Sequence, residues 1–82
     1  MPFFVYLVEC RDNSFYCGYT TDIKQRIINH NKGIGSKYTK RRRPVRLIYF
    51  EEFSSKSEAL KREYQIKQFS RKQKEELAKG FV

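Results

Sequence analysis

Apolar and aromatic residues open the chain in two short runs. FFVYLVEC spans residues 3–10 and SFYCGYT spans residues 14–20, and both runs are rich in aromatic and β-branched side chains. Arg11, Asp12 and Asn13 separate them, and polar residues such as Asp and Asn favour a tight turn. The pattern therefore predicts a β-hairpin.

The length of this turn decides which side chains share a face of the hairpin. Successive strand residues point to opposite faces, so a shift of one residue reverses the whole pattern. A two-residue turn at 12–13 would place Tyr6 and Tyr16 on opposite faces, whereas a three-residue loop over 12–14 would pair Cys10 with Tyr16 and align the two tyrosines. We expect the three-residue loop.

Three helices are predicted beyond the hairpin, each with a capping residue at its start. Short oxygen-bearing side chains accept an orphan amide hydrogen there, and Glu or Gln three residues later completes a capping box. The apolar run VRLIYFEEF at residues 45–53 predicts a third strand after a basic, glycine-containing surface loop at 33–44. The helices are expected from Thr21 or Asp22 to about Lys32, with Gly33 as the stop, from Ser55 to about Gln68, and from Ser70 to about Lys79.

This order, ββαβαα, predicts an α+β fold with a three-stranded antiparallel sheet flanked by helices. Apolar residues occur at both parities of the third strand, which indicates cover on both faces of the sheet. A chain of 82 residues is shorter than a usual domain of roughly 100–200 residues. We therefore expect a single domain over residues 1–82.

The positive charge of the chain indicates what kind of partner it binds. Eighteen Lys and Arg residues face nine Asp and Glu residues, which leaves a net charge of +9. Such a balance predicts a polyanionic partner, and nucleic acid fits it. We expect no membrane partner, because we find no basic amphipathic helix, no apolar run near the ~18 residues of a span, and no leader pattern.

The cysteines and the histidine do not form a recognisable zinc pattern. Cys10 and Cys17 are the only cysteines, His30 is the sole histidine, and both thiols fall in strand-like runs where they pack as small apolar groups. Two cysteines in a lysine-rich chain without a leader indicate a reducing compartment. We therefore expect a cytoplasmic protein.

Glu63 is the first candidate for chemistry. Helical spacing assigns Ala59, Leu60 and Ile66 to the inward stripe of their helix, and Glu63 falls at its centre. An unpaired buried carboxylate is costly, so this side chain must either pair with one of the many cations or hold a metal ion. Both readings stay open on the sequence pattern alone.

The hairpin tyrosines and the first helix supply further candidates. Arg26 and His30 lie one turn apart at the edge of the buried helical face and should look back towards the sheet. Each of these four residues alone is more often structural: Tyr6 and Tyr16 as rim tyrosines, Arg26 as a surface cation, His30 as a packing residue. Gly18 within a strand indicates a bulge or the close approach of another group.

Taken together, these residues resemble the stand-alone GIY-YIG domain proteins of bacteria and, more distantly, the nuclease modules of the excision-repair endonuclease UvrC and of homing endonucleases. The resemblance spans nearly the whole chain. It departs from the family pattern in the missing glycine of the first tripeptide, in Cys17 for isoleucine, and in a missing lysine near the second tyrosine. The matching segments are Phe4-Val5-Tyr6 or Val5-Tyr6-Leu7, Tyr16-Cys17-Gly18, Asp22 to Arg26 with His30-Asn31, Ser36 to Thr39, Arg42 to Val45, and Ser57 to Lys67 around Glu63.

The resemblance implies an endonuclease that hydrolyses phosphodiester bonds with one Mg²⁺ or Mn²⁺ ion held by Glu63. One carboxylate suffices for such an ion, which keeps several waters and takes ligands from its substrate. Tyr6 or Tyr16 would accept a proton from the attacking water, helped by a nearby cation because a free tyrosine is a poor base at neutral pH. Arg26 would hold the scissile phosphate, and His30 would orient the phosphate or the second tyrosine.

The basic loop is the expected contact with nucleic acid, with DNA preferred over RNA and a role in DNA repair or nucleic-acid processing. Cations matched to phosphates give affinity without reading sequence. Tyr38 in the same loop would also help to orient the phosphate or the second tyrosine. The expected nucleic-acid-binding residues are Lys37, Tyr38, Lys40, Arg41, Arg42, Arg43 and Arg46.

Two other classes of function remain open from the sequence. A non-catalytic nucleic-acid-binding or ribosome-associated module on the same scaffold would keep the basic surface without needing Glu63 near Tyr16. A small structural interaction protein would explain the aromatic core but not the charge.

Overall fold

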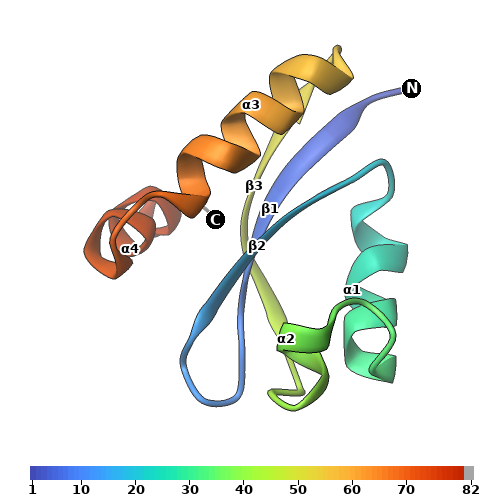
Figure 1. The fold of residues 1–82 in the computed structure, drawn as a ribbon, viewed down its shortest axis with the longest axis vertical. Coiled ribbons are helices and arrows are strands. Elements are labelled where there is room, and N and C mark those ends of the chain that lie inside the picture. Colours follow the sequence, from blue (N-terminus) through green and yellow to red (C-terminus); the bar gives the residue numbers. More distant parts are fainter. Residues whose placement is uncertain (81–82) are drawn as a thin grey trace.

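The sheet of the protein contains three antiparallel strands in the order β2-β1-β3, so β2 lies at one edge. We describe residues 1–80 of a computed structural model. The strands are β1 (Phe3–Glu9), β2 (Phe15–Thr20) and β3 (Arg46–Phe53). The predicted α+β class with a three-stranded antiparallel sheet is confirmed (Figure 1).

The hairpin has the predicted face alignment but a different loop. Tyr6 pairs with Gly18 and Val8 pairs with Tyr16, so both tyrosines point to the same face. The loop comprises residues 11–13, because Cys10 is bonded to Ser14 and not aligned with Tyr16 as predicted. Asn13 adopts φ 68°, a left-handed conformation that Asn tolerates, and this closes a three-residue loop one position earlier than expected.

The helices begin and end close to their predicted bounds. Asp22, Ser55 and Ser70 accept backbone hydrogen bonds as N-caps, and Gly33 ends the first helix in the left-handed conformation. The pattern missed one short helix, α2, which Ser36 caps within the basic loop. No helix of the described residues is long and apolar enough to cross a membrane. The helices are α1 (Ile23–Lys32), α2 (Lys37–Lys40), α3 (Lys56–Lys67) and α4 (Arg71–Lys79).

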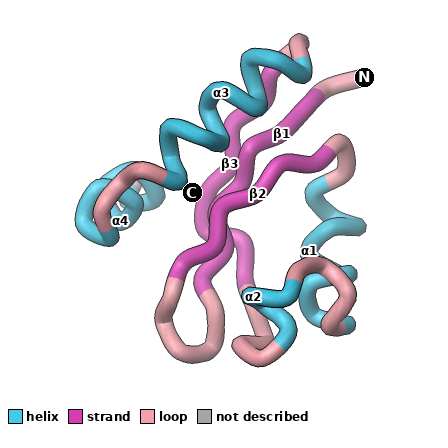
Figure 2. Tube along the Cα trace, viewed as in Figure 1, coloured by secondary structure: helices cyan, strands magenta, loops and turns pink. Residues whose placement is uncertain are grey.

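Helices cover both faces of the sheet, as the third strand predicted. In Figures 1 and 2, α3 and α4 lie on one side of the strands and α1 and α2 on the other. Leu60, which was expected on the inward stripe of its helix, is instead 40% exposed.

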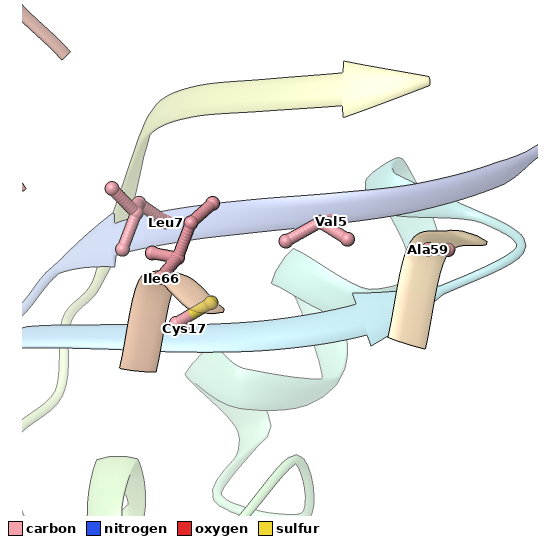
Figure 3. Close-up of a cluster of buried hydrophobic side chains, with 5 residues drawn as sticks. All are labelled: Val5, Leu7, Cys17, Ala59 and Ile66. Carbon is pink, nitrogen blue, oxygen red and sulfur yellow. The ribbon is translucent and has the colours of Figure 1, made fainter. Parts of the chain in front are cut away.

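Two apolar clusters form the core, one on each face of the sheet. The α3 face buries Val5 and Leu7 of β1 and Cys17 of β2 against Ala59 and Ile66 of α3 (Figure 3). The α1 face buries a cluster of different character, because a tyrosine belongs to it. Its buried members are Tyr6, Val8, Cys10 and Val45.

Candidate active site

Two tyrosines stand side by side on the α1 face of the hairpin. Tyr6 belongs to the central strand and is completely buried, whereas Tyr16 belongs to the edge strand and is partly exposed. This difference follows from the strand order, since the central strand is flanked on both sides and β2 on only one. Only the Tyr16 side chain of the pair therefore reaches the solvent.

Helix α1 brings Arg26 and His30 to the inner tyrosine. The Arg26 Nε atom donates to the Tyr6 hydroxyl at 3.1 Å, and that hydroxyl lies 2.7 Å from His30 Nε2. Asp22 starts the helix by accepting from the Gln25 amide, which sets the phase that turns both side chains towards the sheet. The predicted orientation of Arg26 and His30 is thus present.

The hydrogen bonds of this cluster can be assigned in a single direction. Arg26 donates to Tyr6, whose one hydroxyl hydrogen is then donated to His30 Nε2. His30 in turn donates from Nδ1 to Thr39 Oγ1 at 2.7 Å, and Thr39 donates to the Ser36 carbonyl. The imidazole is therefore neutral and carries its proton on Nδ1.

Burial fixes the protonation states of the inner pair. It raises the pKa of Tyr6 to about 12, although the hydrogen bond and charge of Arg26 act in the opposite sense. Burial and the nearby Arg26 charge lower the pKa of His30 to about 4. The hydrogen bond to Tyr6 raises the pKa of Arg26. At neutral pH the cluster is a neutral phenol and a neutral imidazole beside one cation.

Two glycines make room for these rings. A methyl group at Gly18 would meet the Tyr6 hydroxyl and lie 2.6 Å from its Cζ atom, and one at Gly35 would lie 2.6 Å from His30 Cγ. Contacts that short force the neighbour to move. The close approach that a glycine in a strand indicated at Gly18 is therefore made by Tyr6.

The outer tyrosine is braced by a stack of side chains. The Tyr38 ring stacks on Tyr16 with centroids 5.8 Å apart. The Arg42 guanidinium lies 4.0 Å from the Tyr38 ring centroid in a cation–π contact. Asp12 in the hairpin loop accepts from Arg42 at 3.1 Å. Tyr38 thus contacts the second tyrosine.

Glu63 lies on a different side of the sheet from the other four candidates. Its helix packs on the α3 face, and its carboxylate pairs with Lys67 at 3.3 Å with 19% of the side chain exposed. Within residues 1–80, no hydrogen bond or ion pair joins it to Tyr6, Tyr16 or Arg26. The structure therefore brings Tyr6, Tyr16, Arg26 and His30 together and places Glu63 apart from them.

Glu63 nevertheless faces the edge of the sheet that carries Tyr16. Its neighbour Arg62 pairs with Glu51 of β3, and the Glu63 charge raises the pKa of the Cys17 thiol of β2. The Cys17 thiol, next to Tyr16 in β2, lies 4.0 Å from the Glu63 carbonyl oxygen. The tyrosine cluster and Glu63 thus approach the edge strand from its two faces.

A family model for the GIY-YIG catalytic domain matches residues 2–76 of this chain. The chain belongs to the GIY-YIG family. Family membership implies a nuclease fold and a nucleic-acid substrate.

Relatives of high identity extend over most of the chain. A UPF0213 protein of Staphylococcus haemolyticus is 65% identical over 71 residues, which is 87% of each chain. A UPF0213 protein of Halobacterium salinarum is 58% identical over 73 residues, 89% of this chain and 95% of its own.

Two solution structures share the fold. The UPF0213 protein of Bacillus halodurans is 48% identical, with a TM-score of 0.62 over 96% of this chain and 84% of its own. A protein of E. faecalis is 46% identical, with a TM-score of 0.67 over 99% of this chain and 86% of its own.

GIY-YIG nucleases generally use a divalent metal ion, and the donors of this chain fit one kind of ion site. Among the described residues, no three or more His, Cys, Asp or Glu side chains lie close enough together to hold a metal ion, so a cage of protein ligands is not formed there. Glu63 offers one carboxylate whose partner, Lys67, is 49% exposed, and such a pair is weak. A hard ion that retains waters and takes phosphate ligands fits this single donor.

The expected nucleic-acid-binding residues are split by their contacts. Lys37, Lys40, Arg41 and Arg43 are exposed at the surface around α2. Arg42 and Arg46 instead pair with Asp12 and Glu9. The charges of Arg42 and Arg46 are therefore partly neutralised by carboxylates of the protein itself.

Thr39 and Gly35 are site residues that the sequence pattern did not identify. Thr39 is fully buried and anchors His30, and Gly35 packs on the His30 ring. Ser36 accepts from the Thr39 amide three residues later, the spacing of a helix N-cap. That Ser-x-x-Thr spacing is the signal that could have indicated α2 and its inward threonine.

Proposed function

We propose that this chain is a metal-dependent endonuclease that hydrolyses phosphodiester bonds, with DNA preferred over RNA. The observation that carries the proposal is the Arg26 side chain, which the buried Tyr6 hydroxyl holds by a hydrogen bond of 3.1 Å beside the partly exposed Tyr16. A cation fixed between two phenols at the edge of a sheet suits a phosphate group that reacts with water.

Arg26 holds the scissile phosphate in this proposal. Its Nε atom donates to Tyr6, the guanidinium also interacts with the Tyr16 side chain, and its remaining N–H groups are the donors that contact the phosphate oxygens. The hydrogen bond to a buried phenol fixes the guanidinium in place before substrate arrives. Preorganised donors of this kind need little rearrangement in the transition state.

The two tyrosines take different roles. Tyr6 is fully buried, has a pKa of about 12 and donates its hydrogen to His30, so it orients Arg26 and does not accept a proton from water. Tyr16 is exposed enough to contact an attacking water and is the proton acceptor. His30 and Tyr38 position the two phenols, His30 through its hydrogen bond and Tyr38 through its stacked ring.

Glu63 holds the divalent ion, Mg²⁺ or Mn²⁺. When bound, such an ion stabilises negative charge on the phosphate and on the leaving oxygen. The Glu63 main-chain carbonyl lies 4.0 Å from the Cys17 thiol of β2, and the Glu63 charge raises the pKa of that thiol. We therefore place the substrate at the edge strand, with Tyr16 on one face of the sheet and Glu63 on the other. The whole chain acts as one catalytic domain.

A cytoplasmic role in DNA repair or nucleic-acid processing fits these features. Cys10 and Cys17 are free and buried, and burial raises the pKa of the Cys17 thiol to about 12, which suits packing more than redox chemistry. The net charge of +9 provides attraction to a polyanion.

The test is cleavage of end-labelled DNA and RNA oligonucleotides with Mg²⁺, with Mn²⁺ and with EDTA. Glu63→Gln should reduce cleavage about a thousandfold, because the ion supplies several kcal/mol of transition-state stabilisation. Glu58→Gln, an exposed carboxylate on the same helix, is the matched control and should cleave normally. Equal cleavage in EDTA, or by Glu63→Gln, contradicts the proposal.

A non-catalytic nucleic-acid-binding module, free or ribosome-associated, is the second candidate. The Glu63–Lys67 ion pair favours it, since it satisfies the carboxylate without any metal ion. This candidate predicts metal-independent binding and no cleavage by the wild-type chain in the same assay.

A further inference from the structure

The basic segment from Lys37 to Arg46 contains two kinds of cation, those with a carboxylate partner and those without one. Arg42 donates to Asp12 and, at 2.8 Å, to the Tyr38 carbonyl oxygen, and Arg46 pairs with Glu9. These two charges have carboxylate partners in the protein. The remaining arginines of the segment, Arg41 and Arg43, have no ion pair within residues 1–80.

Four cations without carboxylate partners within residues 1–80 line a hollow of about 650 Å³. No acidic side chain lines it. Four positive charges around one hollow repel each other, and an anion placed among them would remove that repulsion. The lining residues are Arg11, Asn31, Lys40, Arg41, Arg43 and Pro44.

Backbone and side-chain hydrogen bonds hold the walls of this hollow together. The Arg11 amide donates to the Arg42 carbonyl at 2.9 Å, which ties the hairpin loop to the basic segment. Asn31 at the end of α1 donates to the Val45 carbonyl at 3.1 Å and accepts from the Val45 amide at 2.7 Å. Figure 1 shows the hairpin loop, α2 and the end of α1 gathered at one end of the molecule.

Arg43 is held in place within this frame. Its Nε atom donates to the Lys40 carbonyl at 2.8 Å, and a methyl group at Gly33 would lie 2.9 Å from one terminal nitrogen of the guanidinium. The side chain therefore lies across the end of α1 instead of extending freely into solvent. Its terminal nitrogens remain available to an anion, because only Nε is engaged in a hydrogen bond.

We propose that this hollow binds the phosphodiester backbone of the substrate next to the scissile phosphate. The inference rests on the proposed function and deepens it by naming a second contact for the same strand. Guanidinium groups match phosphate oxygens in pairs, and three arginines line the hollow. A single phosphate would leave most of four cations unneutralised, so consecutive phosphates of a chain fit the site better.

Helix α1 links the hollow to the candidate active site. His30 points inward to Tyr6, and the next residue, Asn31, lines the hollow. Backbone phosphates bound there would be held at a fixed distance from Arg26 on the same helix. Arg11, outside the basic loop, thus joins the nucleic-acid contacts, whereas Arg42 and Arg46 form ion pairs with Asp12 and Glu9.

The test compares two triple variants with the same loss of charge. Arg11→Gln/Arg41→Gln/Arg43→Gln removes three cations of the hollow. Lys56→Gln/Lys61→Gln/Lys72→Gln removes three exposed cations of α3 and α4 on the other side of the sheet. The Kd for labelled single-stranded and duplex oligonucleotides is measured in EDTA over a series of salt concentrations, with thermal melting as the check of folding.

The hollow variant should bind at least tenfold more weakly, and its slope of log affinity against log salt should be about 2 to 3 smaller, at roughly 0.7–0.9 per phosphate contact. The lysine variant should change by less than half as much. Equal losses in the two triples, or an unchanged slope in the first, overturn the proposal. If Arg43→Gln impairs folding, the Arg11→Gln/Arg41→Gln double variant gives the same comparison against a lysine double.

Two further measurements separate the possible failures. Inorganic phosphate that binds the wild-type chain as tightly as an oligonucleotide overturns the assignment to a nucleic-acid backbone. Binding is measured without metal, so it is independent of cleavage. If the wild-type chain cleaves nothing but the first triple variant binds more weakly, the hollow is supported and the nuclease proposal is contradicted. If the wild-type chain cleaves but the first triple variant binds normally, the nuclease proposal is supported and the hollow is contradicted.

Discussion

The Tyr6 hydroxyl lies 2.7 Å from His30 Nε2, and both side chains are completely buried. This contact joins the central strand to α1 and continues through Arg26 on one side and Thr39 on the other. Within the described residues, no buried side-chain polar atom lacks a hydrogen-bond partner. The polar cluster can therefore be buried without a large cost, and it fixes Arg26 at the edge of the sheet.

Removing the Tyr6 hydroxyl should destabilise the fold. Tyr6→Phe leaves His30 Nε2 buried without a donor and frees Arg26, and we expect a loss of about 1–3 kcal/mol in the free energy of unfolding. Denaturant titration measures it. Tyr19→Phe is the control, because no hydrogen bond of its hydroxyl is formed within residues 1–80. Equal stability of Tyr6→Phe and wild type would contradict the assigned network.

Gly18 should tolerate no side chain. In Gly18→Ala the new methyl group meets the Tyr6 ring, with Cζ 2.6 Å away, and we expect about 1–3 kcal/mol of destabilisation from the forced shift. Gly80→Ala is the matched control, since a methyl group there has no neighbour within 4 Å. Thermal melting of both variants gives the comparison. A Gly18→Ala protein that melts with the wild type would show that Tyr6 lies elsewhere.

Burial of neutral His30 should make stability depend on pH. Its pKa is about 4 in the folded protein and near 6.5 when unfolded, so the unfolded chain binds the extra proton as the pH falls through this window. The free energy of unfolding should therefore be highest above pH 6.5 and decrease as the pH falls towards 4, by at most about 1.4 kcal/mol per pH unit.

The measurement is the free energy of unfolding between pH 5 and 7, where His30, as the sole histidine, is the main titrating side chain. His30→Gln should lose this slope while being less stable at pH 7. A wild-type stability that stays flat over the window, or rises as the pH falls, would mean that the imidazole is not held neutral.

Local signals in the sequence predicted most of the fold. Alternation and turn residues predicted the hairpin, and the capping residues Asp22, Ser55 and Ser70 predicted the helix starts, because each signal acts within a few residues. The loop position was wrong by one residue, since its closure depends on the left-handed conformation of Asn13. Helix α2 was missed because four residues carry too little periodicity.

The candidate site was predictable only in part. Helical spacing placed Arg26 and His30 on the side facing the sheet, and the structure brings both to Tyr6. Spacing also placed Glu63 at the centre of the inward stripe of α3, but which face of the sheet α3 covers depends on long-range topology. The contact between His30 and Thr39 likewise joins separate elements, and no local pattern specifies it.

The measurement that tests the nuclease account most directly is the cleavage rate of Tyr16→Phe beside that of the wild type and of Tyr64→Phe, whose ring is 70% exposed on the outside of α3. Loss of the proton acceptor should lower kcat by roughly 10²–10⁴-fold without changing the melting temperature, and Tyr64→Phe should cleave at the wild-type rate. Cleavage by Tyr16→Phe at the wild-type rate, in the same Mg²⁺ buffer, would contradict the site described above.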